Sequence, residues 1–451
     1  MRTSSRSGFI YLLALLVVLV VSGVAVVMSR GVGLRLRADQ NATARSQCRQ
    51  AALGVLRATL NDLDASMIAG RLPGLVTVKA TGETVGDCTV LLVGRDPAGL
   101  KASFGLIPEA GKIGVNSLVD PTVPAATRSA QETALASLDG MTAGIAASIK
   151  DWMDSDDTPD ANGGAERTDG AYLGAAVSYA PRNAPLETLE ELRLVKGVSD
   201  ALYFGQDANS NGRTDAGESG ATLGLRDLLT FENREPSNAL NGTPRVACLS
   251  NRGTVNVSEL KKLLTQLFNA EQAAVLSSLA QKNQPYANRL ELCIILDEEL
   301  DAQDLDQLWP CLIGPEGRVG LVDAWACHEK VLTALIGSDL AKRMIAARPA
   351  TPPEGASWLT KILSRSEAAI YGRLLTSGSY QFRADLLAVR NDGAGWARLE
   401  ALLDCSSGTA LVRNLRPAES LGWPLPGCTP DQLRRRQPDS DPATLLTSDT
   451  H

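Results

Sequence analysis

The hydrophobic pattern of this chain is dominated by residues 9–28, a run of twenty residues without a charged side chain. A helix rises about 1.5 Å per residue, so this run spans about 30 Å, the thickness of the hydrocarbon core of a bilayer. A cleaved secretory signal has a shorter apolar region, of about 7 to 15 residues. The pattern therefore predicts a membrane-spanning helix, preceded by the short polar segment 1–8.

The next part of the chain has helical and then extended patterns. Apolar residues spaced among Arg, Gln and Asp over residues 31–63 predict that the membrane helix continues as an amphipathic helix. Glycines and a proline at residues 70–74 end it. Short extended patterns then predict strands at residues 75–80, 87–93 and 102–107, and again near the C-terminus at residues 379–386, 397–403 and 410–414.

Between these two groups of strands, residues 116–347 have a helical pattern, with long runs at residues 130–152 and 186–204. A further helix is expected at residues 358–375, and residues 265–315 are interpreted as an extra helical insertion. The chain is therefore predicted to be an α+β protein. Its expected segments are a leader (1–8), an N-terminal helix (9–63, transmembrane over 9–28), the first part of a sheet (64–116), an inserted α-helical domain (117–348), the second part of the sheet (349–428) and a disordered tail (429–451).

The composition argues against two classes of function, nucleic-acid binding and zinc binding. The net charge of -7 and the pI near 5.2 argue against nucleic acid as a partner, because neutralising phosphates needs a basic face. The eight cysteines form no CxxC motif, and the two histidines are His328 and His451, so a zinc site is not expected. We expect at least one disulfide, although eight cysteines allow 105 full pairings among which the sequence does not choose.

The clearest local motif is the segment 207–218, DANSNGRTDAGE. It has the calcium-loop pattern, in which oxygens at positions one, three, five, seven, nine and twelve surround the ion and a glycine at six makes the sharp turn. The ligands would be the side chains of Asp207, Asn209, Asn211, Asp215 and Glu218 and the backbone carbonyl of Arg213. We expect a structural calcium ion here; the alternative is a surface loop with local Asx turns.

A second acidic segment packs many carboxylates into a short stretch. Its candidate metal ligands are Asp151, Asp154, Asp156 and Glu166. Without compensation these charges repel one another, and a cation would relieve the repulsion. The spacing is not that of a calcium loop, and the alternative is a solvated acidic loop with a helix cap.

The start of the chain carries a processing motif. A leader with Arg2 and Arg6 ends at Gly8, and Phe9 begins the apolar helix. This resembles the prepilin peptidase site of type IV pilins and pseudopilins. Pilins of that class usually carry Glu at the fifth position after the cut, where this chain has Leu13. The subunit that typically lacks this Glu is minor pseudopilin K of the type II secretion system.

Later phrases resemble the same family. They are PEAGKI (108–113), DWMDSD (151–156), GAE (164–166), NAPL (183–186) and EELRLVKGV (190–198). The glycine of the first phrase, Gly111, is expected to supply a turn that needs a positive φ. The order and spacing of the phrases fit the family over roughly the first half of the chain, although the chain is long for it.

The resemblance implies a pilin-like fold, in which a long N-terminal helix packs on an antiparallel sheet and a large α-helical domain is inserted. It also implies calcium in the helical domain, cleavage after Gly8 and methylation of Phe9. The implied role is that of a minor pseudopilin at the tip of the type II secretion pseudopilus, taking part in pseudopilus initiation and protein secretion. The implied partners are the other minor pseudopilins, the prepilin peptidase, the inner-membrane assembly platform and the membrane, with the bulk of this single-pass inner-membrane protein in the periplasm.

Two other functions stay open on the sequence: a minor pilin of a type IV pilus, or a membrane-anchored calcium-binding surface or adhesion domain. An enzyme is not expected. The chain has no Gly-x-Ser-x-Gly, P-loop or His-Glu-x-x-His motif, and a Ser-His-Asp site would have to use His328.

Overall fold

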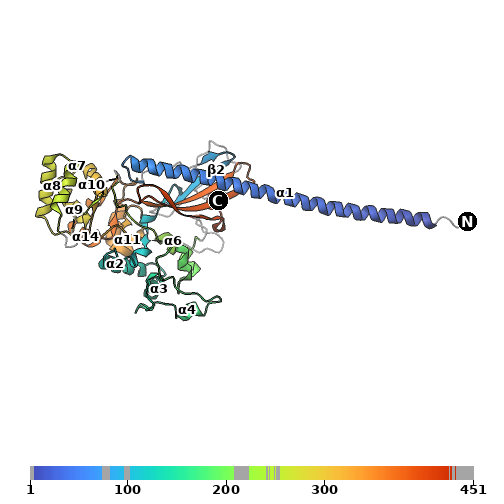
Figure 1. Cartoon of the computed structure of the whole chain (residues 1–451), viewed down its shortest axis with the longest axis horizontal. Helices are drawn as coiled ribbons and strands as arrows, with labels where there is room; N and C mark the ends of the chain where they lie inside the picture. The colour runs from blue at the N-terminus through green and yellow to red at the C-terminus, as the bar shows by residue number, and fades with distance from the viewer. Residues whose placement is uncertain are drawn as a thin grey trace.

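The computed structural model describes residues 5–73, 82–95, 102–207, 223–239, 242, 244–247, 249, 254–425, 427–428 and 432. The N-terminal helix α1 (Ser5–Ile68) is continuous over 64 residues and projects far beyond the rest of the molecule (Figure 1). It passes through Gly8 and Phe9 without a break and extends beyond the predicted 9–63. Residues 9–43 are exposed, whereas from Ala44 onward one face of the helix is buried.

The buried half of α1 lies against an antiparallel sheet in which the strands have the order β1-β2-β11-β12-β13, with β3 beside β2 and β4 beside β11. The strands are β1 (Glu83–Val85), β2 (Cys88–Arg95), β3 (Ala102–Phe104), β4 (Ile107–Pro108), β11 (Gln381–Arg390), β12 (Trp396–Asp404) and β13 (Leu411–Pro417). Strands from both ends of the chain thus share one sheet, which confirms the predicted α+β fold with an inserted helical part. The predicted strand 75–80 lies outside the described residues.

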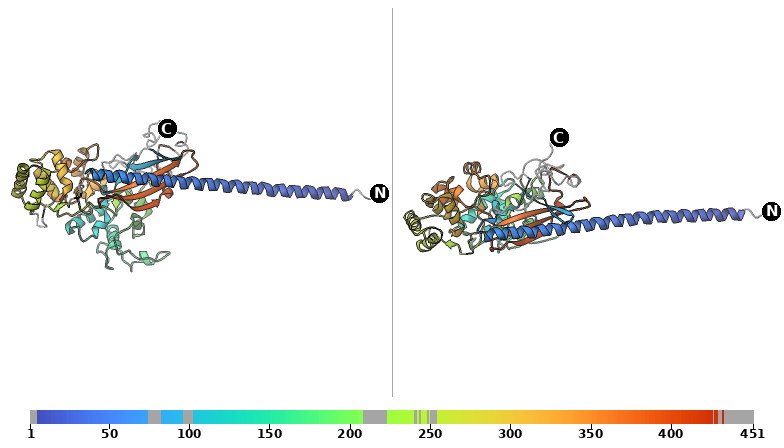
Figure 2. Two further views of the ribbon diagram at one scale, coloured as in Figure 1. Left: turned by 45° about the horizontal axis from the view of Figure 1, so that its top comes forward. Right: turned by 90° about the horizontal axis from the view of Figure 1, so that it is seen from above.

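The part of the chain between β4 and β11 is mainly helical and has a core of its own. Its helices are α2 (Ala125–Ala136), α3 (Ala143–Met153), α4 (Gly170–Leu173), α5 (Asp200–Phe204), α6 (Leu225–Leu228), α7 (Val257–Leu267), α8 (Ala270–Lys282), α9 (Arg289–Leu296), α10 (Ala302–Leu308), α11 (Glu329–Ile336), α12 (Ser338–Ala346), α13 (Ser357–Thr360) and α14 (Arg365–Tyr371). Helices α7 to α10 gather at the end of the molecule farthest from the N-terminus, as Figures 1 and 2 show.

Short 3₁₀ turns and two-residue parallel ladders connect these helices. The ladders pair β5 (Ile113–Gly114) with β6 (Leu229–Thr230), β7 (Val246–Ala247) with β8 (Leu312–Ile313), and β9 (Val322–Asp323) with β10 (Leu375–Thr376). The turns are η2 (Glu109–Gly111), η3 (Val115–Leu118), η4 (Leu189–Leu194), η5 (Trp309–Cys311) and η6 (Glu419–Leu421).

Three long helices predicted from periodicity are broken in the structure. The run 130–152 is divided between α2 and α3, because Gly140 has a φ of 77° and Thr142 caps a new helix by accepting a hydrogen bond from the Ile145 N–H. The run 186–204 contains only the turn η4 and the short helix α5. The predicted helix 358–375 is α13, α14 and β10, with Ser364 starting α14 through a capping box.

The glycine of PEAGKI has a different role from the one predicted. Gly111 does not have a positive φ. A Cβ at this position would lie 2.3 Å from the carbonyl oxygen of Ala326, so the glycine is needed for close backbone contact. The neighbouring charges of the phrase are also structural, since Lys112 Nζ lies 2.6 Å from Glu109 Oε1 and both side chains are buried.

The two faces of the sheet are covered by different parts of the chain. Alternate residues of β11, among them Ala384, Leu386 and Ala388, pack in the core beneath α1. Arg383 and Asp385, which alternate with these residues along β11, therefore point to the opposite face. There Arg383 meets Glu109 of η2, which precedes the helical insert.

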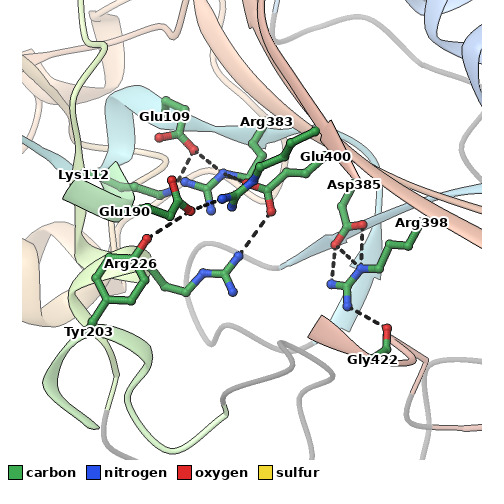
Figure 3. Close-up of polar contacts among 11 residues, drawn as sticks. Glu109, Lys112, Glu190, Tyr203, Arg226, Arg383, Asp385, Arg398, Glu400 and Gly422 are labelled. Carbon is green, nitrogen blue, oxygen red and sulfur yellow. Dashed lines mark hydrogen bonds and ion pairs between the residues drawn. The ribbon is translucent and has the colours of Figure 1, made fainter. Parts of the chain in front are cut away.

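Buried ion pairs connect that second face to the helical insert (Figure 3). Arg383 Nε lies 3.1 Å from Glu109 Oε1. Glu400 of β12 has two partners: its Oε2 lies 3.2 Å from Arg226 Nη2 of α6, and its Oε1 lies 2.7 Å from Arg416 Nη2. Burial raises the pKa of the Glu400 carboxyl, but Arg383, Arg226 and Arg416 outweigh it and hold this pKa at about 2. These charges fix the insert on the sheet, because separating any partner leaves a buried charge uncompensated.

Candidate metal centre

Three carboxylates converge at one end of α3. One ligand oxygen each from Asp151, Asp154 and Glu166 can be chosen so that all lie within 4.8 Å of one another. Asp151 and Glu166 are each only 1% exposed, and Asp154 is half-buried. A group of acids this close and this buried is the arrangement that a hard cation needs.

Local structure accounts for the convergence. Asp151 lies in the last turn of α3, and Asp154 is the residue that ends the helix. The loop then folds back, because the Asp160 N–H donates to Asp151 and the Asp160 carboxylate lies 2.9 Å from Lys150 Nζ. This return brings Glu166, which lies just before α4, alongside the end of α3.

Gly164 makes the return possible. A Cβ at this position would lie 1.9 Å from Asp151 Oδ2, so a side chain larger than hydrogen would displace the carboxylate. On the other side of the loop, Trp152 packs edge-on against Tyr172 of α4, with ring centroids 5.8 Å apart, and against Tyr179 at 6.2 Å. The aromatic contacts hold the segment that carries Glu166 near α3.

The three acids are electrostatically strained when no cation is bound. Burial, followed by the charges of Asp156 and Asp151, raises the pKa of Asp154 to about 6. Burial, followed by Asp151 and Asp154, raises the pKa of Glu166 to about 7. The pKa of Asp151 is raised mainly by burial, against the lowering effect of the Asp160 N–H.

Three buried carboxylate oxygens without a hydrogen-bond partner indicate that a cation fits here. Both carboxylate oxygens of Glu166 and Oδ1 of Asp154 are buried without a hydrogen-bond partner. Buried carboxylate oxygens normally accept hydrogen bonds or bind metal, since desolvating them unpaired is costly. The donor set is all oxygen, which suits calcium or magnesium and not the softer transition metals. The residues present therefore fit a calcium ion.

The structure separates the predicted ligands of this segment into two groups. Asp151, Asp154 and Glu166 come together, while Asp156 lies outside the cluster, is exposed, and accepts a hydrogen bond from the Thr158 N–H. The sequence did not indicate that Lys150 and Gly164 position the loop. The very close approach of Gly164 to Asp151 had no signal in the sequence pattern.

The predicted calcium loop 207–218 lies outside the described residues except for Asp207, which is half-buried. After this segment the described chain resumes at residue 223 and forms α6 and then the strand β6. The proposed ligands Asn209, Asn211, Arg213, Asp215 and Glu218 therefore stay a prediction.

At the N-terminus, Gly8 and Phe9 lie within α1, and the side chains of Phe9 and Leu13 are 68% and 51% exposed. Among the described residues, one helix is long and apolar enough to cross a membrane, and it spans Phe9–Ile68. This is compatible with a single-pass anchor. Cleavage after Gly8 and methylation of Phe9 stay predictions.

His328, the histidine that a triad would need, has a structural role. Its Nδ1 accepts a hydrogen bond from the Lys330 N–H and so caps α11. Burial, followed by the charge of Lys330, lowers the pKa of this imidazole.

One comparison with known proteins agrees with the resemblance found in the sequence. Residues 111–204, which contain the carboxylate cluster, match the family model of type II secretion system protein K. No curated protein matches the sequence. A search of solved structures finds a chain of the GspK-GspI-GspJ complex from the enterotoxigenic Escherichia coli type 2 secretion system, with 15% identity and a TM-score of 0.43, covering 85% of this chain and 99% of that one. The match to the family model is confined to residues 111–204.

Proposed function

We propose that this protein, a member of the type II secretion system protein K family, is a minor pseudopilin anchored in the inner membrane by residues 9–28, with its globular part in the periplasm. The observation that carries the proposal is the family match over residues 111–204, in a chain whose apolar N-terminal helix packs on a sheet. A structural component of this kind needs no catalytic centre.

The tip of the pseudopilus is the place that best suits this chain. In pilin-type fibres the buried N-terminal amine of one subunit is thought to pair with the Glu at position five of a neighbour, because an unpaired charge in an apolar core is costly. Leu13 offers no such carboxylate, and a subunit with none ahead of it loses nothing by lacking it. The helical insert also adds bulk beside the sheet (Figure 2). Inside a fibre, this bulk would clash with successive subunits.

The partners we propose are other minor pseudopilins, in keeping with the complex in which the similar solved chain was found. The exposed residues 9–43 of α1 provide a long apolar and then polar helix surface for packing against their N-terminal helices. The prepilin peptidase and the inner-membrane assembly platform would act earlier, during processing and insertion.

We further propose that calcium is a structural cofactor of the helical insert. Asp151, Asp154 and Glu166 would hold one ion, which would supply the positive charge that these three acids lack. The loop that begins at Asp207 would hold a second ion.

The decisive experiment locates the protein in the assembled system. The full-length chain, tagged at its C-terminus, is extracted from membranes, its intact mass is measured, and assembled pseudopili are labelled with immunogold against the tag. We expect loss of residues 1–8, co-purification of other minor pseudopilins, and label at one end of each fibre. Label along the whole fibre would contradict the tip position, and a chain that retains residues 1–8 would contradict the pseudopilin assignment.

A matched pair of variants tests the role of position 13. Leu13→Glu supplies the carboxylate of ordinary pilins, whereas Leu12→Glu places the same charge on a neighbouring face of α1. We expect Leu13→Glu to keep the label at the fibre end, because the insert still prevents internal packing, and Leu12→Glu to reduce membrane insertion or assembly. Internal labelling with Leu13→Glu would show that the missing carboxylate, and not the insert, excludes the subunit from the shaft.

A further inference from the structure

Two cysteines meet at the point where α1 joins the sheet. Cys48 lies on α1 and Cys88 is the first residue of β2, and their sulfur atoms are 3.8 Å apart. Both side chains are buried, with exposures of 0% and 2%. We propose that Cys48 and Cys88 form a disulfide that fastens the anchor helix to the sheet.

The close approach is built by small residues around the pair. A Cβ on Gly395, in the turn between β11 and β12, would lie 3.0 Å from the Cβ of Ala44, so the absence of a side chain there lets α1 approach the sheet. The Cys48 thiol also lies 3.5 Å from the Gly395 carbonyl oxygen. Ala44 and Cys48 are the first buried positions of α1 after the exposed segment 9–43. The cysteine pair therefore lies where the helix leaves the globular part.

Bond formation needs only a small local movement. The sulfur atoms must approach from 3.8 Å to about 2.05 Å, which side-chain rotation with a slight shift of α1 can supply. Two S–H bonds break and one S–S bond forms, and the two electrons and two protons pass to the disulfide of a thiol-disulfide oxidoreductase, which leaves as a dithiol.

The order of events follows from the surroundings of the pair. Burial, followed by the proximity of Cys88, raises the pKa of the Cys48 thiol to about 12, so little thiolate exists once the helix is docked. The exchange is therefore fastest before α1 closes over the sheet. Packing then slows the attack of reductants on the finished disulfide.

The disulfide makes the attachment of α1 to the sheet resistant to pulling. A pull on the membrane helix acts first on the turn around Ala44 and Cys48, where non-covalent contacts with the sheet begin. A covalent bond at that turn prevents the helix from being peeled from its end. This inference rests on the proposed function in one respect, namely that the globular part lies in an oxidising compartment.

The test traps the thiols of the full-length protein. Cells are quenched in acid, free thiols are blocked with N-ethylmaleimide, and the extracted chain is digested with trypsin without reduction. We expect a disulfide-linked pair consisting of residues 46–49 and 80–95, which contain Cys48 and Cys88. In parallel, protein purified in detergent under reducing conditions is unfolded in urea and refolded in a glutathione redox couple, so that the thiols can react before α1 docks.

Each outcome has a defined meaning. The linked peptides in protein from cells support the bridge. Free thiols in cells with efficient bridging in glutathione support the pairing and contradict the proposed oxidising location. Free thiols in both arms overturn the bridge.

Matched variants measure what the bond does. Cys48→Ala removes the bridge, and Cys405→Ala removes another buried thiol from the same core beneath α1. We expect reduction to accelerate amide exchange in the packed half of α1 on the order of a hundredfold to a thousandfold in the wild type and in Cys405→Ala, and to have no effect in Cys48→Ala. An equal response to reductant in all three proteins would contradict the fastening role.

Discussion

Replacing Glu166 with glutamine should have opposite effects on the helical insert with and without calcium. The substitution keeps the shape of a side chain that is 1% exposed and removes its negative charge. Without calcium, the charge of Glu166 is opposed by burial and by Asp151 and Asp154, which together raise its pKa from 4.5 to about 7. At pH 8 the carboxylate is ionised in both the folded and the unfolded chain, so the folded state bears the whole penalty.

The expected change in folding free energy follows from those two pKa values. A difference of one pKa unit corresponds to 1.36 kcal/mol, so an increase from 4.5 to about 7 costs about 3 kcal/mol of folding free energy. Glutamine removes that cost, and its amide can donate to the neighbouring carboxylates. The calcium-free variant should therefore be more stable than the calcium-free wild type by up to about 3 kcal/mol. With calcium at a hundred times its Kd, the wild type gains about 2.7 kcal/mol, and the variant gains less because it has lost a ligand.

The assay is amide hydrogen exchange on the full-length protein at pH 8, followed by mass spectrometry of peptides from residues 143–173, with a chelator or with calcium. Local exchange is preferred to global melting because a chain with two separate cores need not unfold in one step. Asp156→Asn is the matched control for the lost ligand: it removes a charge that also raises the pKa of Asp154 but lies outside the cluster, so its calcium response should stay that of the wild type. Faster exchange in calcium-free Glu166→Gln than in calcium-free wild type, together with an unchanged calcium response, would refute the reasoning.

Three further predictions concern buried charges and close backbone contacts on the sheet face opposite α1 and beside it. Arg398→Met leaves the buried Asp385 carboxylate without its bidentate partner and should lower the free energy of unfolding in urea by about 3 to 5 kcal/mol. The control Arg49→Met removes a surface pair and should cost about 1 kcal/mol or less. Equal costs would contradict this. The pKa of Glu400 is about 2 in the folded chain and 4.5 as its ordinary value. Its ionised carboxylate therefore stabilises the fold fully above about pH 4.5, and this stabilisation is lost as the pH falls toward 2. In Glu400→Gln, the free energy of unfolding should depend less on pH over that range. Gly111→Ala places a methyl group against a carbonyl oxygen 2.3 Å away and should lower stability by about 1 to 3 kcal/mol, and an unchanged melting temperature would show that the backbone can yield.

The carboxylate site shows how far sequence reasoning reached. The local density of acids predicted that a cation site lies between residues 151 and 166, and the structure brings three of the four predicted ligands together. The choice of Asp154 over Asp156 depends on where α3 ends and on how the loop turns back through Asp160 and Gly164. Those are features of the tertiary fold, which a count of carboxylates does not contain.

By itself the sequence determined the uncharged N-terminal helix and the strands near the C-terminus, but it did not determine where the helices of the insert begin and end. The uncharged run 9–28 gives a membrane-length helix in any context, and alternating residues give the strands near the C-terminus, because helix and strand present their side chains at fixed intervals. The tertiary structure alone decided what covers each face. Arg383 and Asp385 alternate with apolar residues, a pattern typical of a solvated strand face, yet both are in ion pairs on the sheet face opposite α1. The fold brings Glu109 and Arg398 to them. Likewise Cys48 meets Cys88, since the docking of α1 on β2 selects one contact from many possible pairings.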